Sequence, residues 1–397
     1  MQRKQWAALK HNDGVIHPTT RPMKRIYLDY NASTPIDPAV TAAMNRFLDD
    51  HYGNPSSGHW ASTEAKAALD IARGQVAALL GCHNDEIVFT SGGSEANNFA
   101  LKGAYFALRD KGDHIITTRI EHPAIIEPCG FLERLGARLT YLPVDATGRI
   151  DPNELRKAIT PRTILVSIMH ANNEVGTIEP IEDCARIARE HGVLLHTDAA
   201  QSAGKVSTKV NELGVDLLSI AGHKVYAPKG VGALFVRRGV RLEPMIHGAV
   251  HEGGRRAGTE SALLAVGLGK ACELARELTP MDRVRAVRDH FWQELRNRFG
   301  NSVVLNGHPT HRLPNTLNVS FVGLTGAEIL ARLEGVAAST GSACHSGRIE
   351  LSPVLKAMGI APEIGMGTIR FSLGRTTTQD EIDVVVERLT DVFARER

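Results

Sequence analysis

Seven short apolar runs alternate with helical patterns between about residues 59 and 240, and this alternation constrains the fold more than any other feature of the chain. Each run ends in a polar or glycine-rich turn, which is typical of a parallel sheet covered by helices. The predicted strands are 86–90, 114–118, 138–144, 163–169, 192–197, 215–220 and 231–236. The predicted helices between them include 59–80, 94–109 and 180–191. Because doubly wound sheets bind ligands at the carboxyl ends of their strands, we expect polar functional side chains just after these runs.

The pattern changes from about residue 281. A charged amphipathic helix is predicted at 281–299. Short strands follow at 316–321, 335–339 and 368–373, and a terminal helix at 379–395. A chain of 397 residues exceeds what one compact core usually holds, so we predict two domains. The large domain spans 26–280 and has a mostly parallel sheet flanked by helices, and we leave open that its first residues join the smaller domain. The smaller α+β domain spans 281–397.

Residues 1–25 carry six basic side chains and one acid but no apolar run of the kind that a signal peptide needs. We expect a flexible basic arm there. The whole chain has a formal net charge of +2, which gives no reason to expect nucleic acid or an anionic membrane as a partner. Its five cysteines form no C-x-x-C pair, so we expect thiols and a cytoplasmic location, with no metal site.

The turn after the run 86–90 reads Thr90-Ser91-Gly92-Gly93-Ser94-Glu95-Ala96-Asn97-Asn98 and leads into a helical pattern. Small and hydroxyl residues at a strand-to-helix turn expose backbone N–H groups at the positive end of a helix dipole, where a phosphate binds well. A capped helix start without a ligand has a similar sequence, so both interpretations stay open at this point.

Asp198 and Lys224 follow neighbouring apolar runs and are expected at the same edge of the sheet, with Gln201 close to Asp198. A buried carboxylate requires a cationic or hydrogen-bonding partner, and a protonated pyridine nitrogen is one. A lysine held near cationic or apolar groups loses its proton near neutral pH and then forms a Schiff base. Together with a phosphate-binding turn, the two residues indicate a site for pyridoxal 5'-phosphate (PLP).

His122 and Asn173 follow two further runs, 114–118 and 163–169. An imidazole at that position can stack on a cofactor ring and transfer protons. The amide can hydrogen-bond to a ring oxygen or to the substrate. Each has an ordinary alternative, as a structural histidine and as a turn residue.

Cys344 lies in a run of small and polar residues, Ser339-Thr340-Gly341-Ser342-Ala343-Cys344-His345-Ser346-Gly347. Such a run predicts an exposed, mobile loop, whereas structural cysteines prefer apolar surroundings. The other four cysteines lie in or beside apolar helical patterns, at 82, 129, 184 and 272. Cys344 is therefore the candidate nucleophile, with a loop that happens to hold a thiol as the alternative.

In their order along the chain, these motifs resemble those of the cysteine desulfurases, members of the class V aminotransferases with the fold type I PLP architecture. The resemblance runs from about Tyr27 to Glu387. Further motifs that carry it are Tyr27-Leu28-Asp29, Gly53-Asn54-Pro55-Ser56-Ser57, Glu121-His122, Asn172-Asn173-Glu174-Val175-Gly176, Asp198-Ala199-Ala200-Gln201-Ser202, Gly222-His223-Lys224 and Arg370-Phe371-Ser372.

The resemblance implies a role for each matching residue. Lys224 would hold PLP covalently, Asp198 would pair with the pyridine nitrogen, and His122 would stack on the ring. Asn173 and Gln201 would address the ring oxygen. The residues implied to contact the phosphate are Gly93, Ser94, His223 and, across a dimer interface, Thr259. Arg370, with Asn173, would bind the substrate, and Cys344 would receive its sulfur as a persulfide.

The resemblance also implies a homodimer that takes sulfur from L-cysteine, yields L-alanine and passes the sulfur to an acceptor protein. Iron–sulfur, tRNA-thiolation and DNA-sulfur acceptors all stay open. Two other activities also stay open. One is a selenocysteine lyase, because the run Ala343-Cys344-His345-Ser346 resembles the corresponding loop of those enzymes. The other is an aminotransferase or epimerase that does not use Cys344. The chain departs from the common pattern at several positions, which puts the strength of PLP binding in question: Ala221 in place of a phosphate-binding serine, Ala227, Ala249, Val250 and Ser261.

Overall fold

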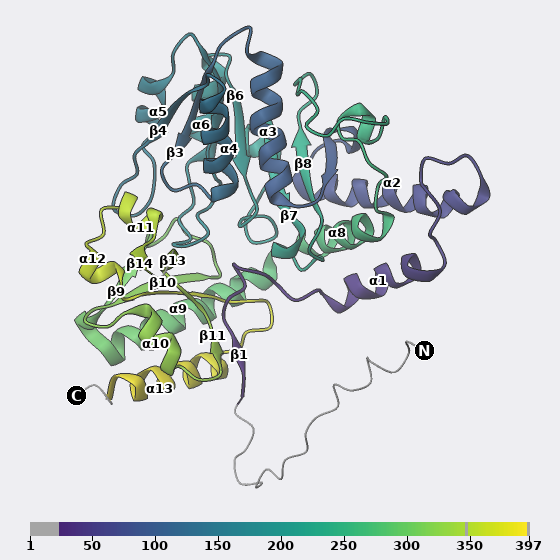
Figure 1. The fold of residues 1–397 in the computed structure, drawn as a ribbon. Helices are drawn as coiled ribbons and strands as arrows, with labels where there is room; N and C mark the ends of the chain where they lie inside the picture. The colour runs from purple at the N-terminus through teal and green to yellow at the C-terminus, as the bar shows by residue number, and fades with distance from the viewer. Residues whose placement is uncertain (1–23, 346–347, 395–397) are drawn as a thin grey trace, which may run out of the picture.

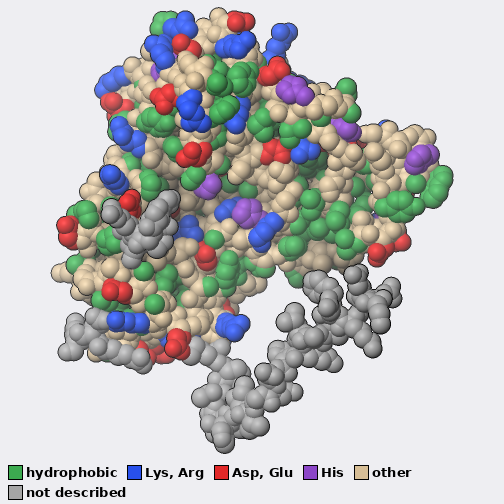
Figure 2. All heavy atoms as spheres, viewed as in Figure 1, with side chains coloured by type: hydrophobic (Ala, Val, Ile, Leu, Met, Phe, Trp, Pro, Cys, Tyr) green, Lys and Arg blue, Asp and Glu red, His purple; other side chains and the backbone are tan. Residues whose placement is uncertain are grey.

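The computed structural model describes residues 24–345 and 348–394. Most of the predicted basic arm, residues 1–23, lies outside the described residues, as do the side chains of 342–349. Figure 1 shows a larger body built around one sheet and a smaller body below it that contains the C-terminal third of the chain. On the face in Figure 2, acidic and basic side chains are interspersed. In the described part of the chain, no helix combines the length and the apolar character of a membrane span.

The larger body is built on a seven-stranded sheet with the order β2-β8-β7-β6-β5-β3-β4. The strands are β2 (Ile87–Thr90), β3 (His114–Thr118), β4 (Arg138–Leu142), β5 (Thr163–Ser167), β6 (Leu194–Asp198), β7 (Leu217–Ala221) and β8 (Gly232–Val236). Each lies within two residues of a predicted strand, so the predicted α/β class is confirmed. Among these seven strands, only β8 has the reversed direction, and it pairs antiparallel with both β2 and β7. Most of these strands are buried along their whole length, which explains why they are continuous apolar runs.

Helices cover both faces of this sheet (Figure 1). One apolar cluster joins the sheet to the helices of the first face, α1 (Pro38–Asp49), α2 (Trp60–Leu80), α6 (Ile181–Glu190) and α8 (Ala262–Ala275). A second cluster joins it to the helices of the other face, α3 (Gly93–Leu108) and α4 (Pro123–Arg134). The shorter helices of this body are α5 (Pro152–Ala158) and α7 (Val210–Leu213). The packed layers hold the carboxyl ends of the strands rigidly, which is where the site forms.

The smaller body has a four-stranded sheet with the order β12-β15-β10-β9. Its elements are α9 (Thr279–Phe299), β9 (Val303–Asn306), β10 (Thr316–Phe321), α10 (Gly326–Arg332), β11 (Val336–Ala337), β12 (Ser339–Thr340), β15 (Thr368–Ser372) and α13 (Gln379–Ala394). The predicted strand 335–339 is divided in two, because β12 pairs with β15 while β11 pairs with β1 (Ile26–Tyr27). Ile26 and Leu28 are buried in the core of this body, so the start of the described chain packs here.

Cys344 lies in a β-hairpin, where the sequence predicts a loop. Strand β13 (Ser342–His345) pairs antiparallel with β14 (Arg348–Leu351), and Cys344 faces Ile349 in the register. The prediction of a loop is therefore wrong for residues 342–345, which pair with β14 although small polar residues have little strand preference of their own. Two short helices follow, α11 (Pro353–Ala357) and α12 (Pro362–Gly365).

Candidate active site

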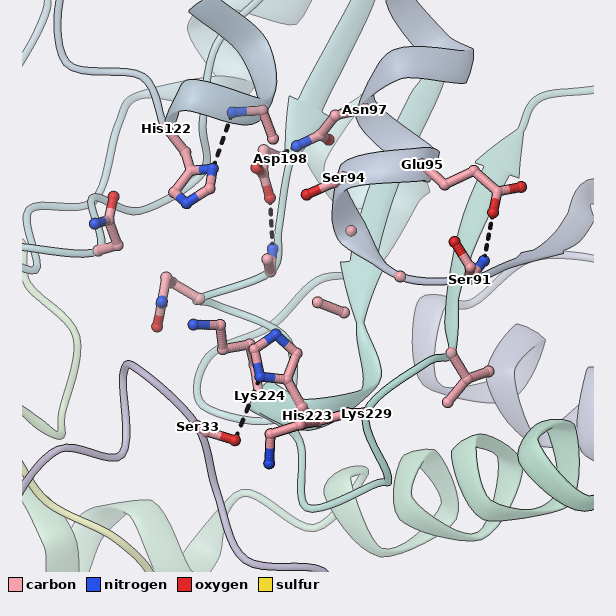
Figure 3. A pocket seen from close by; sticks show the side chains of 18 of the residues that line it. Ser33, Ser91, Ser94, Glu95, Asn97, His122, Asp198, His223, Lys224 and Lys229 are labelled. Carbon is pink, nitrogen blue, oxygen red and sulfur yellow. Dashed lines mark hydrogen bonds between the residues drawn. The ribbon is translucent and has the colours of Figure 1, made fainter. Parts of the chain in front are cut away.

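A cavity of about 510 Å³ lies at the carboxyl edge of the central sheet (Figure 3). Strand ends and the turns after them supply much of its lining. The sequence-predicted residues that line it are Gly93, Ser94, His122, Asn173, Asp198, Gln201, His223 and Lys224. The structure therefore brings together eight candidates that are spread over more than a hundred positions of the chain. The volume of the cavity suits a small cofactor.

Asp198 is the last residue of β6 and its side chain lies in the cavity wall, with the residue 7% exposed. Its Oδ2 accepts a hydrogen bond from Asn97 Nδ2 at 2.7 Å, and its Oδ1 accepts one from the backbone N–H of Ala200 at 2.9 Å. Donors on both oxygens compensate for the loss of water around the carboxylate and fix its orientation. A carboxylate held in this way can bind a cationic N–H group in the cavity.

Lys224 lies in the 3-10 turn after β7 and points into the same cavity (Figure 3). Its Nζ donates to the backbone carbonyls of Asn31 and Ala32. Burial, helped by the charge of Arg370, lowers the pKa of Lys224 to about 8, against the opposing effects of Asp198 and Asp29. An amine with this pKa is partly neutral at physiological pH, so it can act as a nucleophile or a base.

Two imidazoles beside this lysine are held in their neutral form. His122 caps α4, and its Nδ1 accepts the backbone N–H of Ala124 at 3.0 Å, which leaves the proton of the neutral ring on Nε2. Burial and the charge of Lys224 lower the pKa of His122, although Asp198 acts in the opposite direction. Burial, with Lys224 and Lys229, lowers the pKa of His223 to about 4. Neither ring competes with an incoming group for the carboxylate of Asp198.

The N-terminus of α3 opens into the cavity and has the geometry of an anion site. No side chain in the described part of the chain caps it, and Gly92 precedes the helix with φ 153°, which favours glycine. The carboxylate of Glu95, in the first turn, binds Arg256 at 2.9 Å and the backbone N–H of Ser91. This leaves the backbone N–H groups at the start of the helix available to a phosphate. Ala221 contributes only a methyl group to this wall.

Arg370 and Thr259 are the two candidates that do not line this cavity among the described side chains. The guanidinium of Arg370, on β15, donates to Asp29 Oδ1 at 2.8 Å, to Ser339 Oγ at 3.0 Å and to the carbonyl of Asn173 at 2.9 Å. Its Nε is buried and has no hydrogen-bond partner among the described residues. Thr259 lines a neighbouring cavity of about 220 Å³, which shares Ser91, Gly230 and Val231 with the main one.

The cysteines differ in what the structure says of them. Burial raises the pKa of Cys82, Cys129, Cys184 and Cys272 to about 12, so these thiols are unreactive at neutral pH. The side chain of Cys344 lies outside the described residues. Its hairpin is tied to the large body just beyond β14, where Ser352 Oγ donates to Glu174 Oε2 at 2.5 Å.

Sequence reasoning assigned no role to three residues that organise the site. Asn97 holds Asp198 from one turn into α3, and a buried amide in an apolar helix was the available signal. Asp29 binds the guanidinium of Arg370. Asn31 accepts Lys224 Nζ through its carbonyl, a backbone contact that no sequence pattern indicates.

Comparisons with known proteins agree with this geometry. The model of the aminotransferase class-V family matches residues 26–385. The cysteine desulfurase IscS of Dictyoglomus turgidum is 49% identical over 382 residues, which cover 94% of this chain and 96% of that protein. The cysteine desulfurase IscS of Methanosarcina thermophila is 45% identical and covers 94% of this chain and 93% of its own.

Solved structures lead to the same family. A NifS-like protein has a TM-score of 0.88 at 37% identity, and the match covers 94% of this chain and all of that one. A structure described as SspA in complex with cysteine has a TM-score of 0.80 at 38% identity, over 89% of this chain and all of that one. The resemblance noted from the motifs is thereby confirmed: the chain belongs to the aminotransferase class-V family and, within it, to the cysteine desulfurases.

Proposed function

We propose that this protein uses PLP to take sulfur from L-cysteine, releasing L-alanine and leaving a persulfide on Cys344. The proposal rests on one observation: Asp198, Lys224 and the uncapped start of α3 all line the same cavity. Each of these groups suits a different part of the same cofactor. The names of the relatives support the choice of cysteine as the substrate.

Each part of PLP has a matching residue in the cavity. Asp198 would hold the protonated pyridine nitrogen, since its two present donors leave room for a further N–H group. The free amide groups of Gly93 and Ser94 would hold the phosphate. The amine of Lys224 would hold the aldehyde carbon, because it is partly neutral at physiological pH. The methyl group of Ala221 adds no donor, so the start of α3, His223 and, from a second copy, Thr259 would hold the phosphate.

When bound, PLP supplies an electron-withdrawing ring that makes the Cα proton of an amino acid acidic. Asp198 keeps the proton on the ring nitrogen. Lys224, with a pKa of about 8, is suited to taking a proton from Cα and returning it, because such a group is effective in both directions near neutral pH. His122, neutral and with its Nε2–H free of the helix cap, is suited to proton transfer on the other side of the site.

The sulfur step balances without an outside oxidant. The thiolate of Cys344 attacks the sulfur of the substrate, the Cβ–S bond breaks, and its electron pair stays with carbon. After protonation, cysteine and the Cys344 thiol have become alanine and the Cys344 persulfide. A reductant or an acceptor protein then removes the sulfur. Cys344 lies on β13, in a two-stranded pair separate from the four-stranded sheet of the small body.

Arg370 would clamp the substrate carboxylate together with the amide of Asn173. Its guanidinium is planar and already lies against the loop that carries Asn173. Binding of the substrate would replace the contact with Asp29, which occupies the same fork at present.

A homodimer is part of the proposal. Thr259 lines a cavity beside the main one, as expected of a residue that reaches a phosphate held by a second copy. Trp60 and Val250 are each 84% exposed, and a second copy would cover such apolar side chains. A cytoplasmic location is also proposed, supported by the free thiols of the four cysteines with described side chains.

The test is the release of alanine and sulfide from L-cysteine with a reductant present, measured together with the absorbance of bound PLP. We expect turnover by the wild type, loss of covalently bound PLP in Lys224→Ala, and bound PLP without turnover in Cys344→Ala. Equal activity of Cys344→Ala would favour an aminotransferase or epimerase. Turnover of selenocysteine in preference to cysteine would favour a selenocysteine lyase.

A further inference from the structure

Lys205 is a buried cation that the proposed reaction does not use. It is 8% exposed, and burial, with the charges of Lys224, Arg370 and Arg375, lowers its pKa to about 7. Among the side chains that the structure describes, no carboxylate lies within salt-bridge distance of its Nζ. Burying an amine without a counter-ion lowers stability, and the hydrogen bonds of the amine offset part of this cost.

Among the described residues, the side-chain amine of Lys205 donates to Gln201 alone. Its Nζ donates to the backbone carbonyl of Gln201 at 2.9 Å and to the side-chain Oε1 of Gln201 at 3.2 Å. On the other side of the same amide, Gln201 Nε2 donates to the carbonyl of Asn31 at 2.9 Å. That carbonyl also accepts Nζ of Lys224.

These contacts allow the Gln201 amide only one orientation. An amine or ammonium group offers protons to the amide oxygen, and a backbone carbonyl can only accept from the amide NH₂. A flipped amide would set its NH₂ against Lys205 and its oxygen against the carbonyl of Asn31, with repulsion at both ends. Neutral Lys205 could accept a hydrogen bond from a flipped amide through its lone pair, but the amide oxygen would still face the carbonyl of Asn31, which cannot donate.

The fixed orientation gives the cavity a hydrogen-bond donor. One hydrogen of Gln201 Nε2 is used by Asn31, the second has no partner among the described residues, and Gln201 lines the cavity. The matching group is an acceptor such as the ring oxygen of PLP. We propose that Lys205 is a positioning residue that locks the amide of Gln201 so that its NH₂ faces the ring oxygen of the cofactor. This inference rests on the proposed use of PLP.

The test compares Lys205→Met with Lys209→Met. Met keeps the length of the lysine side chain but cannot donate. Lys209 is a matched control because it is also partly buried and donates to one backbone carbonyl, that of Ala78 at 2.7 Å, away from the cavity. We expect Lys205→Met to bind PLP about tenfold more weakly and to shift the absorbance of bound PLP, as loss of one good hydrogen bond predicts. Lys209→Met should do neither.

A second arm separates positioning from a structural role. In the Gln201→Leu background, Lys205→Met should cause no further loss of PLP affinity, because there is no amide left to orient. The melting temperature of the cofactor-free protein identifies a variant that has lost its fold. In that case Lys205→Gln, whose amide still donates, replaces Lys205→Met, with a smaller loss expected.

The results that would overturn this inference differ from those that would overturn the proposed function. A wild type that does not bind PLP would overturn the proposed function and this inference with it. A wild type that binds PLP, together with a Lys205→Met variant of unchanged affinity and spectrum, would overturn the inference alone. The same loss in the Gln201→Leu background as in the wild-type background would also overturn it.

Discussion

The pKa of Lys224 predicts how fast the cofactor-free protein attaches PLP at each pH. A lysine with the ordinary pKa of 10.5 has about 0.03% neutral amine at pH 7, whereas a pKa of about 8 gives about 10%, a gain of about 300-fold in the attacking form. The rate should therefore rise about tenfold per pH unit below pH 8 and level off above it.

Arg370→Gln tests the cause of this shift. Burial is the largest cause and stays, but the variant loses a cation that lowers the pKa of Lys224 and leaves the carboxylate of Asp29, which raises that pKa, without its partner. Both changes raise the pKa of Lys224, so the midpoint of the rate should move to higher pH.

Stopped-flow absorbance of PLP attachment between pH 7 and pH 9.5 measures the rate. Arg109→Gln, at an exposed arginine, is the control and should follow the wild type. A rate that still rises steeply above pH 9 in the wild type, or an unchanged midpoint in Arg370→Gln, would refute the reasoning.

Three further predictions concern the same site and its surroundings. Burial raises the pKa of Glu121 to about 8, so ionisation of its carboxyl group costs stability as the pH rises from the unfolded pKa near 4.5 towards 8. Glu121→Gln should accordingly raise the free energy of unfolding by up to about 3 kcal/mol at pH 7 and have little effect at pH 4, and equal effects in urea titrations at the two pH values would contradict this. Ala221→Ser adds a hydroxyl group to the cavity wall and should tighten PLP binding about three- to tenfold in an equilibrium titration, whereas unchanged affinity would place the phosphate elsewhere. Asp198→Asn replaces the charged partner of the ring nitrogen and should slow alanine formation about 10- to 100-fold with PLP still bound, so full activity would remove Asp198 from its proposed role.

The strands of the large body could be predicted because each is an apolar run that ends in a polar turn, and burial on both faces makes such runs continuous. The antiparallel direction of β8 could not be predicted, since the residues of a buried strand carry no signal of its direction. The hairpin around Cys344 was missed for a different reason. Its residues are small and polar, and pairing with β14 outweighs their weak intrinsic preference.

Some residues of the site could likewise be predicted from the sequence and others could not. Asp198, His122 and Lys224 could be placed at one edge because they follow predicted strands, and parallel strands bring their carboxyl ends together. The contacts of Asn97 with Asp198 and of Gln201 with the carbonyl of Asn31 depend on how α3 and the segment before α1 pack against the end of β6 and the turn after it. Such contacts are made by tertiary packing and leave little trace in a single sequence.

The most direct test of the account is mass spectrometry of the peptide that contains Cys344 after the enzyme has reacted with L-cysteine without a reductant. The account predicts that this peptide gains the mass of one sulfur atom, in an amount equal to the alanine formed, and that Lys224→Ala shows neither product. Alanine formed in that amount without any sulfur on Cys344, or with the sulfur on another cysteine, would contradict it.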